Sequence, residues 1–539
     1  MKTANVLKRM FSFFIFLLFS FVTKNMAYPL STNSRWIINQ RGERTKLACA
    51  NWPAHLQTAV PEGLSKQPVD AVAEKIVAMG FNCVRLTWPL DLATNLTLGT
   101  IVTVRDSFQS LGLNNDISGF ETNNPSMIDL PLIQAYKSVV TTLGKYNVMV
   151  ILDNHLTKPG WCCGNDDGNG FFGDTFFDPA TWISGLTYMA TVFINEGNVV
   201  GMSLRNELRG PKQNVDDWFK YMQQGAEAVH EANPYILVIL SGFSYDTDLS
   251  FVQSRPVNLS FSGKLVFELH RYAFTNTEIW SSKNPNDACG EVLKMIDDGG
   301  GFILRDFPVF LSEFGIDSRG GNVNDNRYIG CILGWAAEND VDWSIWALTG
   351  SYYLREGEQG MIEYYGVLGS DGISVRNNSF LQRLSLIQST LRGPDPQPEL
   401  DNLIFHPLTG LCMLQSSLDP TKVNLGLCNV SQPWDYTTDN TLKLTDIALC
   451  LENTGPNAPV KLSETSCSTP SLSQWQTISA SNMLLAAKST NNSLCLDVDG
   501  DNNLVATNCK CVNGEDSSCD PMSQWFKIVK VNKKKLYNY

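Results

Sequence analysis

Short apolar runs alternate with amphipathic segments through residues 36–392, and this order limits the available folds. The runs have the length of buried strands, and the segments between them repeat apolar residues with a helical period. Eight strands with helices between them predict a parallel sheet closed into a (β/α)8 barrel, an α/β fold. A doubly wound open sheet is the alternative, but no glycine-rich phosphate loop follows any strand. The expected strands are Leu47–Ala50, Cys83–Leu86, Val148–Leu152, Val199–Leu204, Ile236–Leu240, Leu265–Leu269, Val309–Leu311 and Val341–Ile345.

Two segments outside this pattern mark the ends of the first domain. Residues 1–27 carry basic residues followed by the apolar run Met10–Val22, which is too short to span a bilayer and is typical of a secretory signal peptide. An uncleaved anchor is the alternative. Residues 393–398 read Gly-Pro-Asp-Pro-Gln-Pro, a stiff linker without apolar period.

Residues 399–532 contain a threefold repeat. Each unit starts with a Leu-Cys pair, at Leu411, Leu449 and Leu494, and a second cysteine and a tryptophan follow in each. A unit of about 40–50 residues is too small to bury a core alone, so an internal cysteine pair and packing against its siblings are expected. The repeat therefore predicts an all-β domain of three similar parts.

The number of cysteines indicates an exported protein, and the net charge argues against some classes of partner. Fourteen cysteines favour an oxidising compartment. We expect the adjacent Cys162 and Cys163 to pair with separate partners; a strained ring between them is the alternative. A formal net charge of −13, which becomes more negative when the basic leader is removed, argues against nucleic acid or an anionic membrane as partner. Five Asn-x-Ser/Thr sequons offer glycan acceptors, at Asn95, Asn258, Asn377, Asn429 and Asn491.

Polar side chains gather where the predicted strands end, which is where a (β/α)8 barrel carries its active site. Glu207 ends the fourth strand and Glu313 the seventh, and two such acids suggest acid/base chemistry on one substrate. One carboxyl can protonate a leaving sugar oxygen while the other attacks the anomeric carbon or activates water. The other strand-end residues are Arg85, His155, Asn206, His270, Tyr272 and Trp346.

Structural explanations compete with this interpretation. Glu207 could pair with Arg205 or Arg209, and Glu313 could cap a helix. Tryptophans near the rim could stack on sugar rings or belong to the core; the candidates are Trp52, Trp88, Trp161 and Trp280. Acids in the polar loop 160–174 lack the spacing and terminal glutamate of a calcium loop, and no His/Cys spacing suggests zinc, so we expect no metal and no cofactor.

The first domain resembles glycoside hydrolase family 5, the cellulase family. The resemblance rests on an ordered set of motifs: Asn82–Leu86, Ile151–His155, Arg205–Glu207, Glu268–Tyr272, Ser312–Gly315 and Ser344–Trp346. It implies a retaining mechanism in which Glu207 is the acid/base and Glu313 the nucleophile. It further implies that Asn206 contacts the sugar 2-hydroxyl and that His270 and Tyr272 tune the carboxylates. Arg85 would support the nucleophile, and His155 and Trp346 would line the subsite where the bond breaks. Leu208 departs from the proline that often follows the acid/base, so we expect altered loop geometry without loss of activity.

The rear domain resembles a ricin B-type β-trefoil lectin. Its Gln-x-Trp motif survives only at Gln432–Trp434, and in the other two repeats the glutamine stands one place closer to the tryptophan. The resemblance implies that sugar-contacting acids follow the first cysteine of a repeat, which makes Asp497 and Asp499 candidates in the third. Both could equally cap a tight turn.

The favoured hypothesis is a secreted, extracellular glycosidase, in the cell wall or apoplast if the source is a plant. Its partner would be a β-linked glucan or mannan, as polysaccharide or oligosaccharide, and we expect a monomer. One alternative is a lectin-like protein whose barrel has lost catalysis. Another is a transglycosylase, which uses the same residues and differs in whether water or sugar accepts the intermediate.

Overall fold

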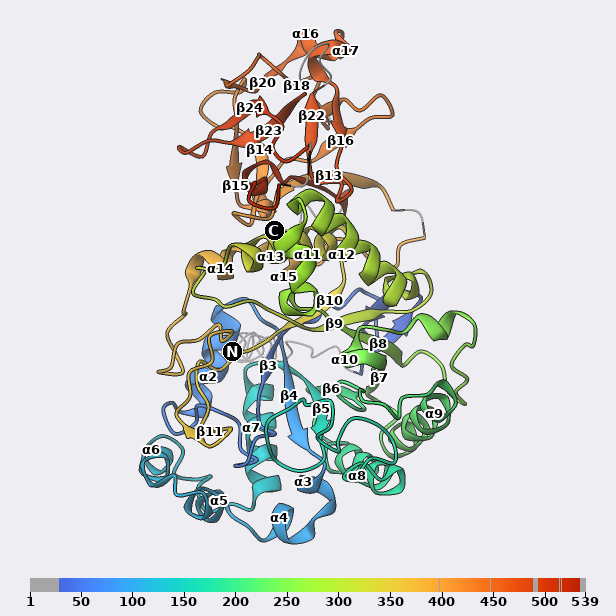
Figure 1. The fold of residues 1–539 in the computed structure, drawn as a ribbon, viewed down its shortest axis with the longest axis vertical. Helices are drawn as coiled ribbons and strands as arrows, with labels where there is room; N and C mark the ends of the chain where they lie inside the picture. The colour runs from blue at the N-terminus through green and yellow to red at the C-terminus, as the bar shows by residue number, and fades with distance from the viewer. Residues whose placement is uncertain are drawn as a thin grey trace, which may run out of the picture.

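A computed structural model describes residues 29–396, 398–445, 447–487, 493–512, 514 and 516–533. The predicted signal peptide, residues 1–27, and the sequon at Asn491 lie outside these residues. Figure 1 shows a barrel domain, coloured blue to yellow, with a smaller domain of strands, orange to red, at one end of the molecule. Within the described ranges, no helix is both long and apolar enough to cross a membrane.

Eight parallel strands form the closed barrel, which confirms the predicted fold. They pair in chain order, and the last strand closes against the first through Ser344 and Cys49. Five of the eight run one to four residues further at the carboxyl end than their apolar runs suggested, so several rim residues belong to the strands themselves. The strands are β3 (Ala48–Trp52), β4 (Cys83–Pro89), β5 (Met149–Leu156), β6 (Val199–Ser203), β7 (Leu237–Leu240), β8 (Leu265–His270), β9 (Val309–Phe314) and β10 (Asp342–Ile345).

Helices cover the barrel because each buries an apolar stripe against the strands. The main ones are α2 (Val69–Ala78), α7 (Leu132–Lys145), α8 (Pro179–Val192), α9 (Val215–Ala232), α12 (Pro285–Gly299) and α13 (Val323–Asn339). Asn322 caps α13 by accepting from the amides of Asn324 and Asp325, so this helix begins three residues before the predicted start at Asn326. The short helices after β4 were not predicted: α3 (Asp91–Thr94), α4 (Leu96–Thr100), α5 (Val104–Ser110) and α6 (Asn114–Asn123).

The amino-terminal end of the barrel is closed by a hairpin, β1 (Ser31–Asn33) and β2 (Trp36–Ile38). Leu30 and Ile37 join an apolar cluster with residues of the strands above. Buried ion pairs, Arg44 with Asp342 at 2.9 Å and Lys46 with Asp340 at 2.8 Å, surround it. The polar rim and the functional cavity therefore lie at the opposite end.

The rear domain is a β-trefoil with its own apolar core. Three disulfides join the two cysteines within each repeat, at Cys412–Cys428, Cys450–Cys467 and Cys495–Cys509, as the repeat predicted. The strands are β13 (Leu400–His406), β14 (Leu411–Gln415), β15 (Val423–Gly426), β16 (Trp434–Tyr436), β17 (Leu442–Leu444), β18 (Cys450–Glu452), β19 (Ala458–Pro459), β20 (Lys461–Ser463), β21 (Trp475–Thr477), β22 (Leu485–Ala487), β23 (Leu494–Val498), β24 (Leu504–Asn508) and β25 (Lys527–Asn532).

The third repeat differs from the first two in the partner of its tryptophan. Trp434 and Trp475 donate their indole hydrogens to backbone carbonyls of their own repeats, whereas Trp525 donates to Asn286 of α12 at 2.8 Å. This repeat also carries an insertion, residues 510–520, closed by the disulfide Cys511–Cys519; we name it the docking loop. The trefoil is therefore packed directly against α12 and α13, as Figure 1 shows.

One buried guanidinium holds the docking loop. Arg327 of α13, which is 4% exposed, donates to the carbonyls of Ser517 at 2.8 Å, Cys519 at 2.7 Å and Ser518 at 3.3 Å. Asn284 adds a hydrogen bond to the carbonyl of Cys511 at 2.8 Å. Backbone carbonyls need partners when buried, so these donors fix the position of the loop.

The prediction for the adjacent cysteines was wrong. Cys162 and Cys163 are bonded to each other, because Cys49 pairs with Cys83 and Cys289 with Cys331. With those four cysteines used, no thiol in the barrel is left for either one.

Candidate active site

The eight strand-end residues converge on one cavity at the carboxyl end of the barrel. The cavity has a volume of about 710 Å³. Six of the predicted residues line it: His155, Glu207, His270, Tyr272, Glu313 and Trp346. Arg85 and Asn206 lie beneath, 0% and 1% exposed, and reach the others through hydrogen bonds. The structure therefore brings the whole predicted set together.

Glu313, within β9, is surrounded by hydrogen-bond donors. Its Oε1 accepts from Arg85 Nη1 at 2.9 Å, and its Oε2 accepts from the Tyr272 hydroxyl at 2.9 Å, with His270 Nδ1 3.7 Å away. Burial raises the pKa of Glu313 to about 7, against the lowering effect of His270 and Arg85. Donors on both oxygens stabilise the ionised form and aim the carboxylate at the cavity.

Glu207, just after β6, has a different environment. His270 Nδ1 lies 3.0 Å from its Oε1, and its carboxyl makes no ion pair with an arginine among the described residues. Arg209 instead donates to the Glu207 backbone carbonyl, and Arg205 to Asn154, so the ion-pair explanation does not hold. Burial raises the pKa of Glu207 to about 7. A carboxyl with a raised pKa and few donors is suited to keep its proton near neutral pH.

The two carboxyls are close together. One carboxylate oxygen of Glu207, one of Glu313 and a ring nitrogen of His270 all lie within 4.8 Å of one another. Retaining glycosidases place their carboxyls about 5–5.5 Å apart, whereas inverting ones need about 6.5–9.5 Å to admit a water. The bound of 4.8 Å lies nearer to the shorter of these two ranges.

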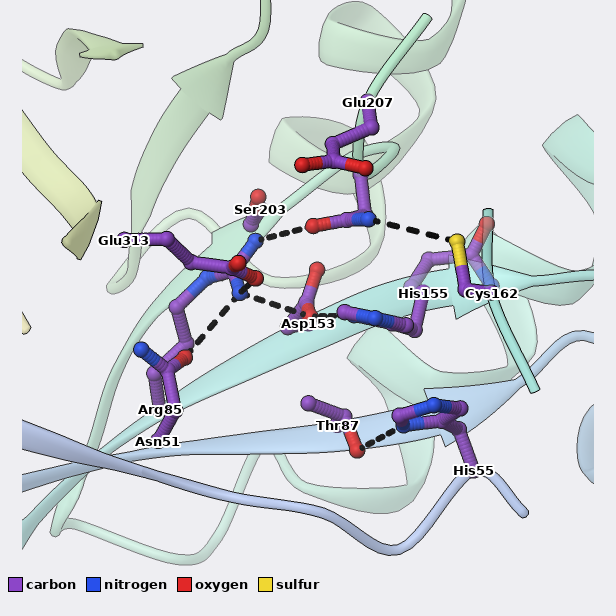
Figure 2. Close-up of polar contacts among 12 residues, drawn as sticks. Asn51, His55, Arg85, Thr87, Asp153, His155, Cys162, Ser203, Glu207 and Glu313 are labelled. Carbon is purple, nitrogen blue, oxygen red and sulfur yellow. Dashed lines mark hydrogen bonds and ion pairs between the residues drawn. The ribbon is translucent and has the colours of Figure 1, made fainter. Parts of the chain in front are cut away.

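Arg85 ties the floor of the site together, as Figure 2 shows. Besides Glu313, it contacts Asp153 at 3.0 Å, Glu268 at 3.5 Å and the amide oxygen of Asn206 at 3.0 Å. Sequence reasoning missed both buried acids, although a signal was present. Asp153 stands two residues before His155 and Glu268 two before His270, and residues two apart on a strand share a face.

Stacked rings form one wall. His155 stacks on Trp346 with ring centroids 5.6 Å apart, and His55 stacks on the other histidine at 3.9 Å. A hydrogen bond of 2.7 Å joins His155 Nδ1 to Asp153 Oδ2 and fixes the orientation of the ring. Burial lowers the pKa of His155 well below its usual value, so the imidazole is neutral. His55, which the sequence did not single out, is thus a supporting member of the wall.

Most of the tryptophans proposed for sugar stacking belong to the core. Trp52, Trp88 and Trp280 are at most 2% exposed, and all three belong to the main apolar core of the barrel domain. Trp161 does line the cavity, with the Arg355 guanidinium 3.4 Å above its ring. An exposed aromatic that the sequence did not suggest, Phe274, also lines it and stacks on Tyr272 at 4.7 Å.

The acids of the loop after β5 hold that loop in shape. Asp167 accepts from the amides of Gly164 and Asn169 and pairs with Arg209. Asp174 accepts from the amide of Phe171. Their carboxylates face these donors and do not converge on a common point.

The lectin candidates have uses inside the trefoil. Asp497 is 3% exposed, and its Oδ2 accepts from Thr507 at 2.6 Å and Gln524 at 3.1 Å, with Lys510 Nζ at 3.1 Å. Asp499 accepts from the amides of Asp501 and Asn503 and so caps a tight turn. The structure places neither of them near the barrel cavity.

Comparison with known proteins supplies two family matches. Residues 40–351 match the model for cellulase (glycosyl hydrolase family 5), and residues 403–517 match the ricin-type beta-trefoil lectin domain. A glycosyl hydrolase 5 family protein of Chamaecyparis obtusa is 42% identical over 532 residues, covering 94% of each chain. The major extracellular endoglucanase of Xanthomonas campestris pv. campestris is 21% identical over 368 residues, 64% of this chain and 68% of that one.

Solved structures agree on the barrel fold. The catalytic domain of the Xanthomonas endoglucanase superimposes with a TM-score of 0.54 at 20% identity, covering 67% of this chain and 99% of that one. A cellotetraose complex of an endocellulase from Pyrococcus horikoshii gives a TM-score of 0.54 at 18% identity, covering 68% of this chain and all of that one.

Proposed function

The chain belongs to glycosyl hydrolase family 5, and on that premise we propose that it cleaves a β-linked glucan or mannan by a retaining mechanism. The observation that carries the proposal is the short distance between Glu207 and Glu313, combined with their unequal surroundings. Donors surround Glu313 and favour its ionised form, while Glu207 keeps a proton. Glu313 is therefore proposed as the nucleophile and Glu207 as the acid/base.

In the first step a Glu313 oxygen attacks the anomeric carbon while Glu207 gives its proton to the leaving oxygen. The glycosidic bond breaks, and a glycosyl ester forms on Glu313. In the second step the Glu207 carboxylate takes a proton from water, and the water oxygen attacks the anomeric carbon. The ester bond breaks, so Glu313 is free again and Glu207 is again protonated.

The remaining rim residues would bind and orient the sugar. Arg85 holds the amide oxygen of Asn206 and so orients the amide nitrogen, which donates to the sulfurs of Cys162 and Cys163 at 3.8 and 3.7 Å and would meet a sugar hydroxyl when substrate binds. The Tyr272 hydroxyl fixes Glu313 before attack. His155 and Trp346 offer a stacked surface beside the bond that breaks.

We further propose that the protein acts outside the cell as a barrel, residues 36–392, joined by the linker 393–398 to a trefoil, residues 399–532, that adds carbohydrate binding. All fourteen cysteines are disulfide-bonded, which fits an oxidising compartment. The signal peptide and the glycan acceptors remain predictions.

The test is turnover by the secreted protein on a panel of β-glucans, β-mannans, cellotetraose and aryl β-glycosides. Proton NMR of the first product anomer distinguishes retention from inversion, and product analysis separates water from sugar as acceptor. We expect the anomer with the β configuration of the substrate. An inverted first product would refute the assignment of Glu313, and glycan binding without any turnover would favour a lectin.

A further inference from the structure

An unusual turn lies beside Glu207. After β7, the short helix α10 (Phe243–Asp246) contains three consecutive residues in the left-handed region, Ser244, Tyr245 and Asp246, with φ of 53°, 61° and 58°. A left-handed conformation costs a residue other than glycine roughly 1–2 kcal/mol, so three in succession need support from their surroundings. The amide of Tyr245 donates to the carbonyl of Leu208 at 3.0 Å and ties the turn to the loop that carries Glu207.

The turn places the Asp246 carboxyl under the acid/base. Asp246 is fully buried, and its Oδ2 accepts from the Glu207 amide at 3.0 Å. The same oxygen lies 3.5 Å from His270 Nε2, while the opposite ring nitrogen lies 3.0 Å from Glu207 Oε1. Asp246 thus contacts the backbone of Glu207 directly and reaches its carboxyl through His270.

Two polar atoms of His270 and Asp246 are buried without a hydrogen-bond partner among the described residues. They are His270 Nε2 and Asp246 Oδ1. Buried polar atoms without partners are uncommon in native proteins, and catalytic hydrogen bonds often tighten only when substrate binds. Nε2 lies 3.5 Å from the other carboxyl oxygen, Asp246 Oδ2, so a small movement would complete a hydrogen bond between the two side chains.

We propose that Asp246 is a positioning residue for the proton donor: it holds the Glu207 backbone and orients His270 so that the imidazole Nδ1–H points at Glu207 Oε1. The proposal rests on the assignment of Glu207 as the acid/base. With Oε1 accepting from His270, the proton of the Glu207 carboxyl is confined to Oε2. That oxygen is the one left to meet the glycosidic oxygen.

The charges around Asp246 agree with this orientation. Burial, with Glu268 and Glu207 nearby, raises the pKa of Asp246 well above its usual value, against the effect of Arg85 and the Glu207 amide. Burial also lowers the pKa of His270, so the ring is neutral and carries one proton. A protonated Asp246 donates to Nε2, which leaves the ring proton on Nδ1. An ionised Asp246 would draw that proton to Nε2 and leave Nδ1 to take the proton of Glu207.

Leaving-group dependence tests the proposal. A 2,4-dinitrophenol leaving group departs without protonation, whereas the sugar of an oligosaccharide needs the proton of Glu207. General acid catalysis contributes about 10²–10⁴-fold, so partial loss in Asp246→Ala should lower kcat/KM for the oligosaccharide by about 10–100-fold. For the dinitrophenyl glycoside of the same sugar we expect less than about a threefold change, because kcat/KM reports the first bond cleavage.

Two further variants keep the test decisive. One oxygen of Asp246 both accepts from the Glu207 amide and lies nearest His270 Nε2, so Asp246→Asn keeps the acceptor and needs a small rotation to bring its amide nitrogen to Nε2. We expect its oligosaccharide kcat/KM to fall less than that of Asp246→Ala, and its activity on the dinitrophenyl glycoside to stay within about threefold of the wild type, even if the alanine variant folds poorly. Asp248→Ala is the matched control: this half-buried residue close to the same turn accepts from the Ser250 amide, and its carboxylate forms no hydrogen bond or ion pair with Glu207 or His270.

Each outcome decides the matter. Equal losses on both substrates in Asp246→Ala would make the residue a support of the barrel only and overturn the inference. The same result would follow if Asp246→Asn lost as much oligosaccharide activity as Asp246→Ala. A wild-type protein that hydrolyses neither substrate would overturn the proposed function, and the inference with it. If the wild type is active and Asp246→Ala has the same ratio of kcat/KM values for the two substrates as the wild type, the inference alone is overturned.

Discussion

The barrel mouth and the third trefoil repeat both hold buried carboxyls that the sequence marks as candidate sugar contacts, and they use them differently. Glu207 and Glu313 line a cavity of about 710 Å³, and burial raises the pKa of both to about 7. Asp497 is closed off by Thr507, Gln524 and Lys510, and hydrogen bonds from Thr507 and Lys510 lower its pKa against the effect of burial.

The difference lies in whether a carboxyl has hydrogen-bonding capacity left for a ligand. Glu207 has one protein partner for its side chain and an open oxygen beside the cavity. The Oδ2 of Asp497 is already saturated by its own repeat. Burial without partners suits a group for proton transfer, whereas burial with a full set of partners suits a structural role.

Of the tests of this contrast between the barrel and the trefoil, removal of the proposed nucleophile, Glu313, should have the largest effect. Glu313→Ala should lower kcat by at least about 10⁴-fold, because the glycosyl ester cannot form. The melting temperature should change little, since Arg85 keeps Asp153 and Glu268 as partners. Glu291→Ala, which removes a surface ion pair with Lys283, is the control and should keep full activity. Retained activity in Glu313→Ala would refute the assignment.

The second test is the pH profile of kcat/KM. Glu207 must be protonated and Glu313 ionised, so activity rises as Glu313 loses its proton and falls as Glu207 loses its own. Both pKa values are raised to about 7, and interaction between the sites separates them into an acidic and an alkaline limb. Two pH units above the alkaline limb should cost about 100-fold in kcat/KM. Glu207→Gln should abolish that limb, and a wild-type profile that stays flat through the alkaline range would contradict the pairing.

A third test separates the two domains. Arg327→Ala leaves three carbonyls of the docking loop without their charged donor, so we expect the trefoil to lose about 2–3 kcal/mol of docking stability. Calorimetry should then show an earlier transition for the trefoil ahead of the barrel. Arg255→Ala, which removes an exposed pair with Asp216, should leave the trace unchanged. An unaltered trace in Arg327→Ala would show that the other contacts suffice.

The smallest effect is expected in the trefoil acid itself. Asp497→Ala should lower the free energy of unfolding by about 1–2 kcal/mol, because Thr507 and Gln524 lose their acceptor, and leave glycan retention unchanged. Since the folded pKa of Asp497 lies below its usual value, this contribution is present above that value and is lost as the pH falls through the folded pKa. If Asp497→Ala lost glycan retention and kept its stability, Asp497 would be a ligand-binding residue like the carboxyls of the barrel, and the contrast between the two domains would not hold.

The sequence predicted the site residues that stand at the ends of periodic apolar strands. Apolar runs ending in polar residues located the eight strands, and the carboxyl ends of parallel strands must share one edge, so Glu207 and Glu313 could be brought together before any coordinates. Asp246 could not be found this way, because a left-handed turn of Ser, Tyr and Asp has no compositional signal. Nor could the docking loop, whose role depends on an Arg327 nearly two hundred residues away in sequence. The choice between sugar stacking and core for Trp52, Trp88 and Trp280 stayed open in the sequence, because position near a strand end does not give the direction of a side chain.

The contacts between Arg327 and the docking loop also fix the spacing between the trefoil and the barrel cavity. A module on a free tether samples a volume that grows with the tether, and this volume sets the local concentration of its ligand at the catalytic centre. Here Asn284, Asn286 and Arg327 already hold the third repeat against the barrel. Lengthening the proline-rich linker would therefore leave the spacing between trefoil and cavity unchanged, because the docking contacts set this distance and the linker does not.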